Sequence, residues 1–298
     1  TQDSDVELGI GDDCAVLSVP NDQQIVVTTD TLVERTHFPA AADAEKIGYR
    51  TCATALSDIA AMGGVARWAS LALTAPEFDE AWFSRFVAGI RRAFAVDNTV
   101  LIGGDLTRGP LAISWHITGT VERGKALCRS GCRVGDRIFV TGELGGAAYA
   151  LSVLDAKDID PSVLNAYWAP QPRLALGRAI AAIANSCIDI SDGFLGDLHH
   201  LLNASTTSAV LNLDTVPLAS TAQELSRQER LALALNGGDD YELFFTADKT
   251  HRPYIETLRK QHGISITEVG EIVGTKDQHQ VMTTAGDILR AKSYQHFH

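Results

Sequence analysis

Residues 43–76 read DAEKIGYRTCATALSDIAAMGGVARWASLALTAP, and this stretch indicates the fold class. Apolar side chains recur near helical spacing from residue 43 to residue 62, which predicts a helix that the Gly63-Gly64 pair ends. The β-rich residues 66–75 predict a strand that follows the helix directly, and Pro76 stops it. A helix that leads straight into a strand is typical of an α/β protein.

The same alternation continues on both sides of this stretch. In the first part we expect strands at 24–29, 99–102 and 111–121, a helix at 79–95 and a Gly-rich loop at 103–110. In the second part we expect strands at 137–141, 187–190, 208–213, 242–247 and 264–273, and helices at 172–185, 193–203, 221–235 and 250–261. A polar, Gly-containing stretch near residue 125 predicts two domains, at 1–125 and 126–298. The expected class is α/β (α+β).

Composition excludes several kinds of protein. The 298 residues include 25 Lys and Arg against 37 Asp and Glu, a net charge of −12, which argues against nucleic-acid binding. No apolar run approaches the ~20 residues that cross a bilayer, so we expect no membrane partner. The five cysteines are odd in number in a long chain, which favours a reducing compartment and a cytoplasmic location.

Acidic residues recur beside glycines or at strand ends. They occur in GIGDD (9–13), TTD (28–30), LSD (56–58), GGD (103–105), IDISDG (188–193) and GGDDYE (237–242). Each motif alone fits a solvated turn, a strand-end Asp or a helix cap. Asp58 is harder to explain, because no Lys or Arg occurs between Thr51 and Val65 to pair with it. The set as a whole predicts a multi-metal site built from distant loops.

The chemistry expected at such a site is phosphoryl transfer. Mg²⁺ prefers carboxylate oxygens and commonly bridges to the phosphates of a substrate. The sequence has no evident nucleophilic triad and no HExxH zinc motif. Direct transfer, with metal ions and positioning as the catalysts, therefore fits better than covalent catalysis.

Seven motifs in order resemble the thiamine-monophosphate kinase family, whose superfamily includes aminoimidazole ribonucleotide synthetase and selenophosphate synthetase. They are GIGDDCAV (9–16), TTDTLVERTHF (28–38), LSDIAAMGG (56–64), LIGGDLTRGP (101–110), LCRSGCRVGD (127–136), IDISDG (188–193) and GGDDYEL (237–243). The resemblance implies ATP-dependent phosphorylation of thiamine monophosphate to thiamine diphosphate, the last step of thiamine diphosphate biosynthesis, with several Mg²⁺ ions. It also implies a homodimer, with an N-terminal mixed sheet that dimerises into a β-barrel and a C-terminal α/β domain that completes the active site.

The resemblance also assigns residues by position. The metal ligands it implies are Asp13, Thr28, Thr29, Asp30, Asp58, Asp105, Asp189 and Asp192. The ATP contacts it implies are Gly104, Asp105, Arg129 and Ser191, and the substrate contacts are His37, Asp239 and Tyr294. Among these we expect Asp30, Asp105, Arg129 and Asp192 to be catalytic. The family carries Glu where this chain has the shorter Asp239.

Two other functions remain open at the level of sequence. One is a different ATP-using enzyme of the superfamily, either selenophosphate synthetase-like or ribonucleotide-cyclising. The other is a non-catalytic protein that binds Mg²⁺ and nucleotide. The former would respond to a different acceptor, and the latter would bind Mg-ATP without any turnover that depends on an acceptor.

Overall fold

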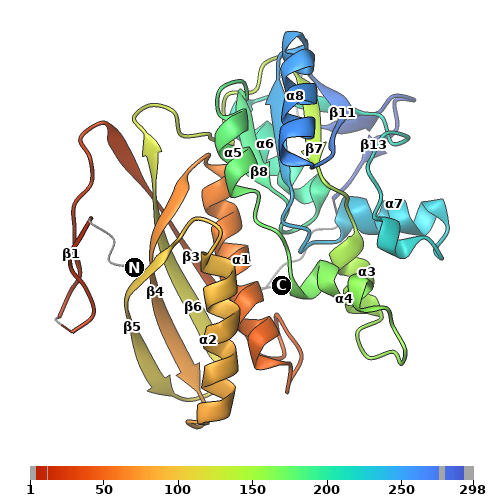
Figure 1. Ribbon diagram of the computed structural model, residues 1–298. Coiled ribbons are helices and arrows are strands. Elements are labelled where there is room, and N and C mark those ends of the chain that lie inside the picture. The colour runs from red at the N-terminus through yellow and green to blue at the C-terminus, as the bar shows by residue number, and fades with distance from the viewer. Residues whose placement is uncertain (1–4, 12, 275–278, 292–298) are drawn as a thin grey trace.

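The computed structural model describes residues 5–11, 13–274 and 279–291, which form two lobes (Figure 1). The first lobe consists of β1 (Val6–Leu8), β2 (Val16–Leu17), β3 (Gln23–Val33), α1 (Ala44–Ala61), β4 (Val65–Ala75), α2 (Glu80–Phe94), β5 (Val100–Arg108) and β6 (Ala112–Glu122). Its main sheet has the order β3-β6-β4-β5, in which only β4 and β5 are parallel. The mixed N-terminal sheet expected from the sequence is therefore confirmed.

The second lobe contains the remaining elements. They are β7 (Arg137–Thr141), α3 (Gly146–Ser152), α4 (Pro161–Trp168), α5 (Leu174–Ile180), β8 (Ser186–Asp189), α6 (Phe194–Ser205), β9 (Ser208–Leu211), η1 (Ser220–Ala222), α7 (Arg227–Asn236), β10 (Leu243–Ala247), η2 (Lys249–His251), α8 (Arg252–His262), β11 (Ile266–Val273), β12 (Val281–Thr283) and β13 (Ile288–Leu289). Their sheet has the order β13-β12-β9-β11-β7-β10-β8 and is antiparallel except between β12 and β9. The division of the chain at residue 125 stays a prediction.

Helix α1 is the central element of the molecule. It packs with α2 on one face of the four-stranded sheet and contacts α4, α5 and β8 of the second lobe (Figure 1). Fifteen of its 18 residues are buried, and most of them are small or hydroxyl-bearing. Small side chains let a helix approach neighbours on several sides at once, and apolar residues all around a helix are typical of a buried one. Any polar side chain on α1 therefore needs a partner from a neighbouring element.

The second sheet separates two hydrophobic cores. Phe139 and Phe245 stack with ring centroids 5.3 Å apart in the core that also contains α1, α5 and α8. Phe194 meets Phe244 edge to face in the other core, beneath α6. The alternation of side chains along β7 and β10 produces this arrangement, because successive residues point to opposite faces. The first core is continuous between the lobes, so α1 and the second sheet hold each other in place.

Three predicted boundaries were wrong. The helix predicted at 221–235 begins at Arg227, because Ser226 caps its start and residues 220–222 form the separate 3-10 helix η1. Residues 103–108 continue strand β5 instead of forming a loop, and Gly104 (φ +153°) permits this because a Cβ there would lie 2.1 Å from the Leu71 carbonyl oxygen. The helix predicted at 172–185 covers only 174–180, where a turn ends it. The described helices include none that is long and apolar enough to cross a membrane.

Candidate active site

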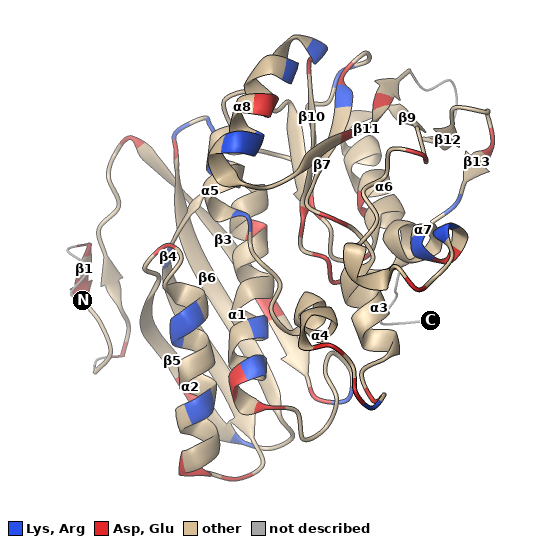
Figure 2. Cartoon of the chain, turned by 45° about the vertical axis from the view of Figure 1, so that its right-hand side comes forward, with Lys and Arg blue, Asp and Glu red and all other residues tan. Residues whose placement is uncertain are grey.

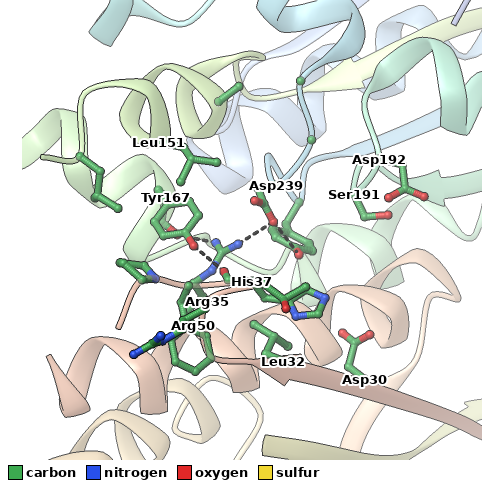
Figure 3. Close-up of a pocket in the computed structure, with 18 of the residues that line it drawn as sticks. Asp30, Leu32, Arg35, His37, Arg50, Leu151, Tyr167, Ser191, Asp192 and Asp239 are labelled. Atoms are coloured by element: carbon green, nitrogen blue, oxygen red, sulfur yellow. Dashed lines mark hydrogen bonds and ion pairs between the residues drawn. The ribbon is translucent and has the colours of Figure 1, made fainter. Parts of the chain in front are cut away.

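A cavity of about 780 Å³ lies between the two lobes (Figure 3). The end of β3 and the loop after it form one wall, and the segments around α3 and α4 with the loops at 191–192 and 236–241 form the other. Five residues that the resemblance assigns line this cavity: Asp30, His37, Ser191, Asp192 and Asp239. Figure 2 shows acidic segments on the loops where the lobes face each other, next to α3 and α4.

Three carboxylates interact at the inner end of β3. Burial and the negative charge of Asp58 raise the pKa of Asp30 to about 6, against a hydrogen bond with Thr54 that lowers it. Burial, Asp58 and Asp30 together raise the pKa of Asp189 to about 7. Burial also raises the pKa of Asp58, although Thr28 and the positive charge of Arg129 oppose this. The charge of Asp58 acts on both other carboxylates and that of Asp30 acts on Asp189, so the three side chains lie within electrostatic reach of one another.

Helix α1 supplies hydroxyls and a carboxylate to this group. The Ser57 hydroxyl donates to Asp189 Oδ2 over 2.7 Å, and the Thr28 hydroxyl of β3 donates to Asp58 Oδ2. Arg50, Thr54, Ser57 and Asp58 are spaced so that they share one face of the helix. The sequence analysis singled out only Asp58, yet a polar stripe on an otherwise apolar helix is a signal that identifies all four.

The carboxylate of Asp197 shapes the loop after β8. Asp197, in the first turn of α6, accepts the backbone N–H groups of Ser191 and Asp192 over 3.1 Å each. Burial, Asp189 and Asp192 raise the pKa of Asp197 to about 8. The sequence analysis missed Asp197, although an acid in the first turn that reaches back to preceding N–H groups is a known helix-start pattern. It fixes the direction in which Ser191 and Asp192 face the cavity.

The 236–241 loop is fastened to the loop after β8. The Asp239 N–H donates to the Ser191 carbonyl, and the Tyr241 N–H donates to the Ile190 carbonyl, both over 2.9 Å. Gly238 is required at this contact, because a Cβ there would lie 2.2 Å from the Ser191 oxygen. The Asp240 carboxylate accepts the Gly145 N–H over 2.8 Å at the start of α3. These bonds assemble the cavity wall from three segments far apart in sequence.

Other assigned residues lie outside the cavity. Asp105 is on β5 at the opposite edge of the sheet from β3, in register with Thr31 through Ser114 and Ala72. Three strand spacings separate these edges by about 14 Å. Gly104 is its neighbour on the same strand. One chain therefore does not bring Asp105 to Asp30.

The remaining assigned residues are dispersed. Asp13 is exposed on the loop that joins β1 to β2, a hairpin on the far side of β5 from the second lobe (Figure 1). Thr29 is exposed and its hydroxyl hydrogen-bonds with His116 Nδ1 over 3.1 Å. Tyr294 lies outside the described residues. Within the described ranges, no three His, Cys, Asp or Glu side chains already form a group that could hold a metal ion.

Comparison with known proteins identifies the family. Residues 11–121 match the AIR synthase related protein N-terminal domain, and residues 133–281 match the C-terminal domain of the same family. Thiamine-monophosphate kinase from Haemophilus influenzae is 41% identical over 276 residues, which cover 91% of this chain and 84% of that protein. The chain belongs to the thiamine-monophosphate kinase family. The resemblance stated from the motifs is confirmed.

Solved thiamine-monophosphate kinase structures share the fold. The crystal structure from Stenotrophomonas maltophilia K279a has a TM-score of 0.90 and 37% identity, and the match covers 96% of this chain and 93% of that one. A complex of AaThiL with AMPPCP and TMP has a TM-score of 0.83 and 28% identity, covering 97% of this chain and 92% of that one. Two domains of mixed α/β content are thus a property of this chain and of the thiamine-monophosphate kinases alike.

Proposed function

We propose that this chain transfers the γ-phosphoryl group of ATP to the phosphate of thiamine monophosphate, giving ADP and thiamine diphosphate. The observation that carries the proposal is the group of Asp30, Asp58 and Asp189 beside a cavity between the lobes, in a chain of this family. A phosphate oxygen of the acceptor attacks the γ-phosphorus, and the bond to the β–γ bridging oxygen breaks. The reaction needs positioning and charge neutralisation more than covalent help from the protein.

The acidic group fits Mg²⁺. Buried carboxylates with raised pKa values repel one another and lack enough cationic partners, and a hard divalent cation relieves this repulsion. We propose Asp30, Asp58, Asp189 and Asp192, with the Thr28 hydroxyl, as its ligands in this chain. Bound Mg²⁺ supplies neutralisation and alignment of the phosphate oxygens. We also propose Asp13, Thr29 and Asp105 as ligands, although their positions in one chain lie apart from the cavity.

The nucleotide and the acceptor have separate candidate contacts. We propose that Arg129 and Ser191 contact ATP together with Gly104 and Asp105, because a guanidinium pairs well with phosphate oxygens. For the acceptor we propose His37, Asp239 and Tyr294. The Val33 N–H donates to His37 Nδ1 over 3.0 Å, so that nitrogen is unprotonated and the ring proton is on Nε2. A cytoplasmic location fits a reaction that consumes ATP and stays a prediction.

The first experiment measures ADP formation by the purified protein with ATP, Mg²⁺ and thiamine monophosphate. We expect ADP release to depend on thiamine monophosphate. Selenide and a ribonucleotide amidine are the comparison acceptors, since they represent the alternative reactions of the superfamily. Release with one of these and not with thiamine monophosphate would replace the proposal.

Mg²⁺ binding is expected to weaken as the pH falls. Asp30 and Asp189, with pKa values of about 6 and 7 in the metal-free protein, must lose their protons to bind a cation. Their folded-state pKa values exceed the unfolded value of 3.8, so the metal-free fold loses stability as the pH rises from about 4 to 7. Between about pH 8 and pH 5.5 we expect the Mg²⁺ affinity to fall by at least about tenfold.

Titration calorimetry in two buffers of different ionisation enthalpy checks this pH dependence. We expect Mg²⁺ to release protons at pH 6.5, which makes the apparent enthalpy depend on the buffer. An affinity that stays constant over the range, with no proton release, would show that these carboxylates do not bind the metal.

We also propose a homodimer joined through the edges of the four-stranded sheet. In the described part of one chain no strand pairs with the outer edge of β3 or of β5. Both strands expose apolar side chains, namely Ile25 and Val27 on β3 and Leu101 and Leu106 on β5. Open edges of this kind are usually covered in a native assembly. If β3 of one protomer meets β5 of the other, Asp105 of the partner subunit reaches the end of the cavity at Asp30.

Mixing two inactive variants tests this arrangement. Asp30→Asn and Asp105→Asn are each expected to be inactive as homodimers. After the two are unfolded and refolded together, a heterodimer has one site in which both aspartates are intact, and random pairing restores about a quarter of wild-type activity. No recovery, with dimers confirmed by light scattering, would place both aspartates in the site of one chain.

A further inference from the structure

Arg50 is a cation buried inside the molecule at the wall of the cavity. It lies on α1 with 2% of its surface exposed. Its Nη1 donates to the Tyr167 carbonyl over 2.6 Å, and its guanidinium lies over the Tyr167 ring, 3.8 Å from the centroid. Its Nη2 donates to Asp239 Oδ1 over 2.6 Å. Figure 3 shows the guanidinium between these two residues.

Burying the Arg50 guanidinium has a desolvation cost that an apolar side chain would not have. A desolvated cation stabilises a fold little more than an apolar residue of the same size, even when it is paired. Arg50 Nε has no hydrogen-bond partner among the residues that the structure describes, so the pairing is incomplete there. The Asp239 side chain is 30% exposed and lines the cavity, so the pair faces a space that a ligand can fill. These features are more typical of a functional constraint than of packing alone.

The contacts of Asp239 leave one oxygen for a ligand. Oδ1 accepts both the Arg50 guanidinium and the Tyr241 hydroxyl, the latter over 3.0 Å. No donor in the described part of the chain reaches Oδ2. The backbone of Asp239 has φ +70°, a left-handed conformation that Asp tolerates better than most residues. Arg50 therefore binds Oδ1 of Asp239, whose side chain is short and whose backbone conformation is constrained. This contact sets the direction in which Oδ2 points.

Arg50 also reaches the opposite wall of the cavity through Tyr167. The ring that stacks on Arg50 donates its hydroxyl to the His37 carbonyl over 2.5 Å. Both proposed acceptor contacts, Asp239 and His37, are thus tied to the same guanidinium (Figure 3). Arg50 is only 2% exposed and both of its Nη atoms donate to protein oxygens, so we expect it to act on substrate through its neighbours.

We propose that Arg50 is the positioning residue of the acceptor subsite, where it orients Asp239 and, through Tyr167, the His37 segment. This inference rests on the proposed function. The oriented Asp239 Oδ2 accepts a hydrogen bond from an amino group of a cationic heteroaromatic acceptor, a class that includes thiamine monophosphate. ATP binding does not depend on this pair.

Steady-state kinetics of Arg50→Met test the proposal. We expect the KM for thiamine monophosphate to rise at least about tenfold while the KM for ATP stays within about twofold. Arg50→Lys keeps a cation but cannot reproduce the planar, two-sided contact, so an intermediate KM is expected. Arg85→Met is the matched control, since Arg85 on α2 forms an exposed ion pair with Asp43 at the start of α1 and neither residue lines the cavity.

A double-mutant cycle with Asp239→Asn separates positioning from a general structural role. If Arg50 acts through Asp239 and also through the His37 segment, the KM for thiamine monophosphate of the double variant rises by clearly less than the product of the two single effects. Effects that multiply, or equal losses for both substrates, would overturn the proposal. If Arg50→Met does not fold by circular dichroism, Arg50→Lys carries the same cycle. Wild-type protein without activity on thiamine monophosphate would contradict the proposed function instead.

Discussion

Asp58→Asn is expected to lower kcat by about 10²–10³-fold while the protein stays folded. The amide has nearly the same shape and still accepts a hydrogen bond from the Thr28 hydroxyl, so the local geometry is retained. It removes the charge that raises the pKa values of Asp30 and Asp189. The metal-free variant is therefore expected to be at least as stable as the wild type, because a like-charge repulsion is gone.

Kinetics at saturating Mg²⁺ and thermal unfolding without metal, measured on the same preparation, check this prediction. Asp214→Asn is the control, because the Asp214 side chain is 88% exposed in the second lobe, away from the cavity. A kcat for Asp58→Asn within about threefold of the wild type would show that the Asp58 charge has no part in the reaction.

Arg173→Met is expected to destabilise the protein by about 3–5 kcal/mol. Arg173 Nε and Nη2 donate to the two oxygens of Glu242, which is 6% exposed, and Thr141 donates to one of them over 2.6 Å. Removing the guanidinium leaves a buried carboxylate with one hydroxyl partner. This carboxylate directly follows the 236–241 loop, so the same change is expected to loosen the cavity wall.

Comparing the denaturant unfolding of Arg173→Met with that of Arg252→Met measures how burial changes the contribution of an Arg–Glu ion pair to stability. Arg252 makes the same two-pronged contact with Glu268 but is 52% exposed, and its loss is expected to cost less than about 1 kcal/mol. The double change Arg173→Met with Glu242→Leu is expected to recover much of the loss, since it leaves no unpaired charge. Equal destabilisation by the two single Arg variants would contradict this account.

Much of the fold follows from local pattern. The helix predicted at 43–62 is observed at Ala44–Ala61, because Asp43 caps its start and Gly63-Gly64 follows its end. The strand predicted at 66–75 is observed at Val65–Ala75. Short apolar runs bounded by turn residues identified most strands of the second lobe. The two short strands at its edge, β12 and β13, were not predicted.

The sequence predicted which types of residue form the site better than it predicted where those residues lie. A sequence shows that Asp30 and Asp105 both belong to acidic motifs, but strand order decides that they lie at opposite edges of one sheet. The polar stripe on α1 marks Arg50 in the sequence, but its partner could not be predicted from the sequence, because Asp239 lies 189 residues away. Long-range pairing of this kind depends on how the lobes pack, which no local pattern specifies.

The most direct test of the central claim follows the γ-phosphoryl group itself. ATP labelled at the γ-phosphate is incubated with the purified wild-type protein, Mg²⁺ and thiamine monophosphate, and the products are separated. The account predicts label in the terminal phosphate of thiamine diphosphate, with ADP formed in equal amount and no label transferred when Mg²⁺ is chelated. Label found only in inorganic phosphate, or AMP in place of ADP, would contradict direct transfer to thiamine monophosphate.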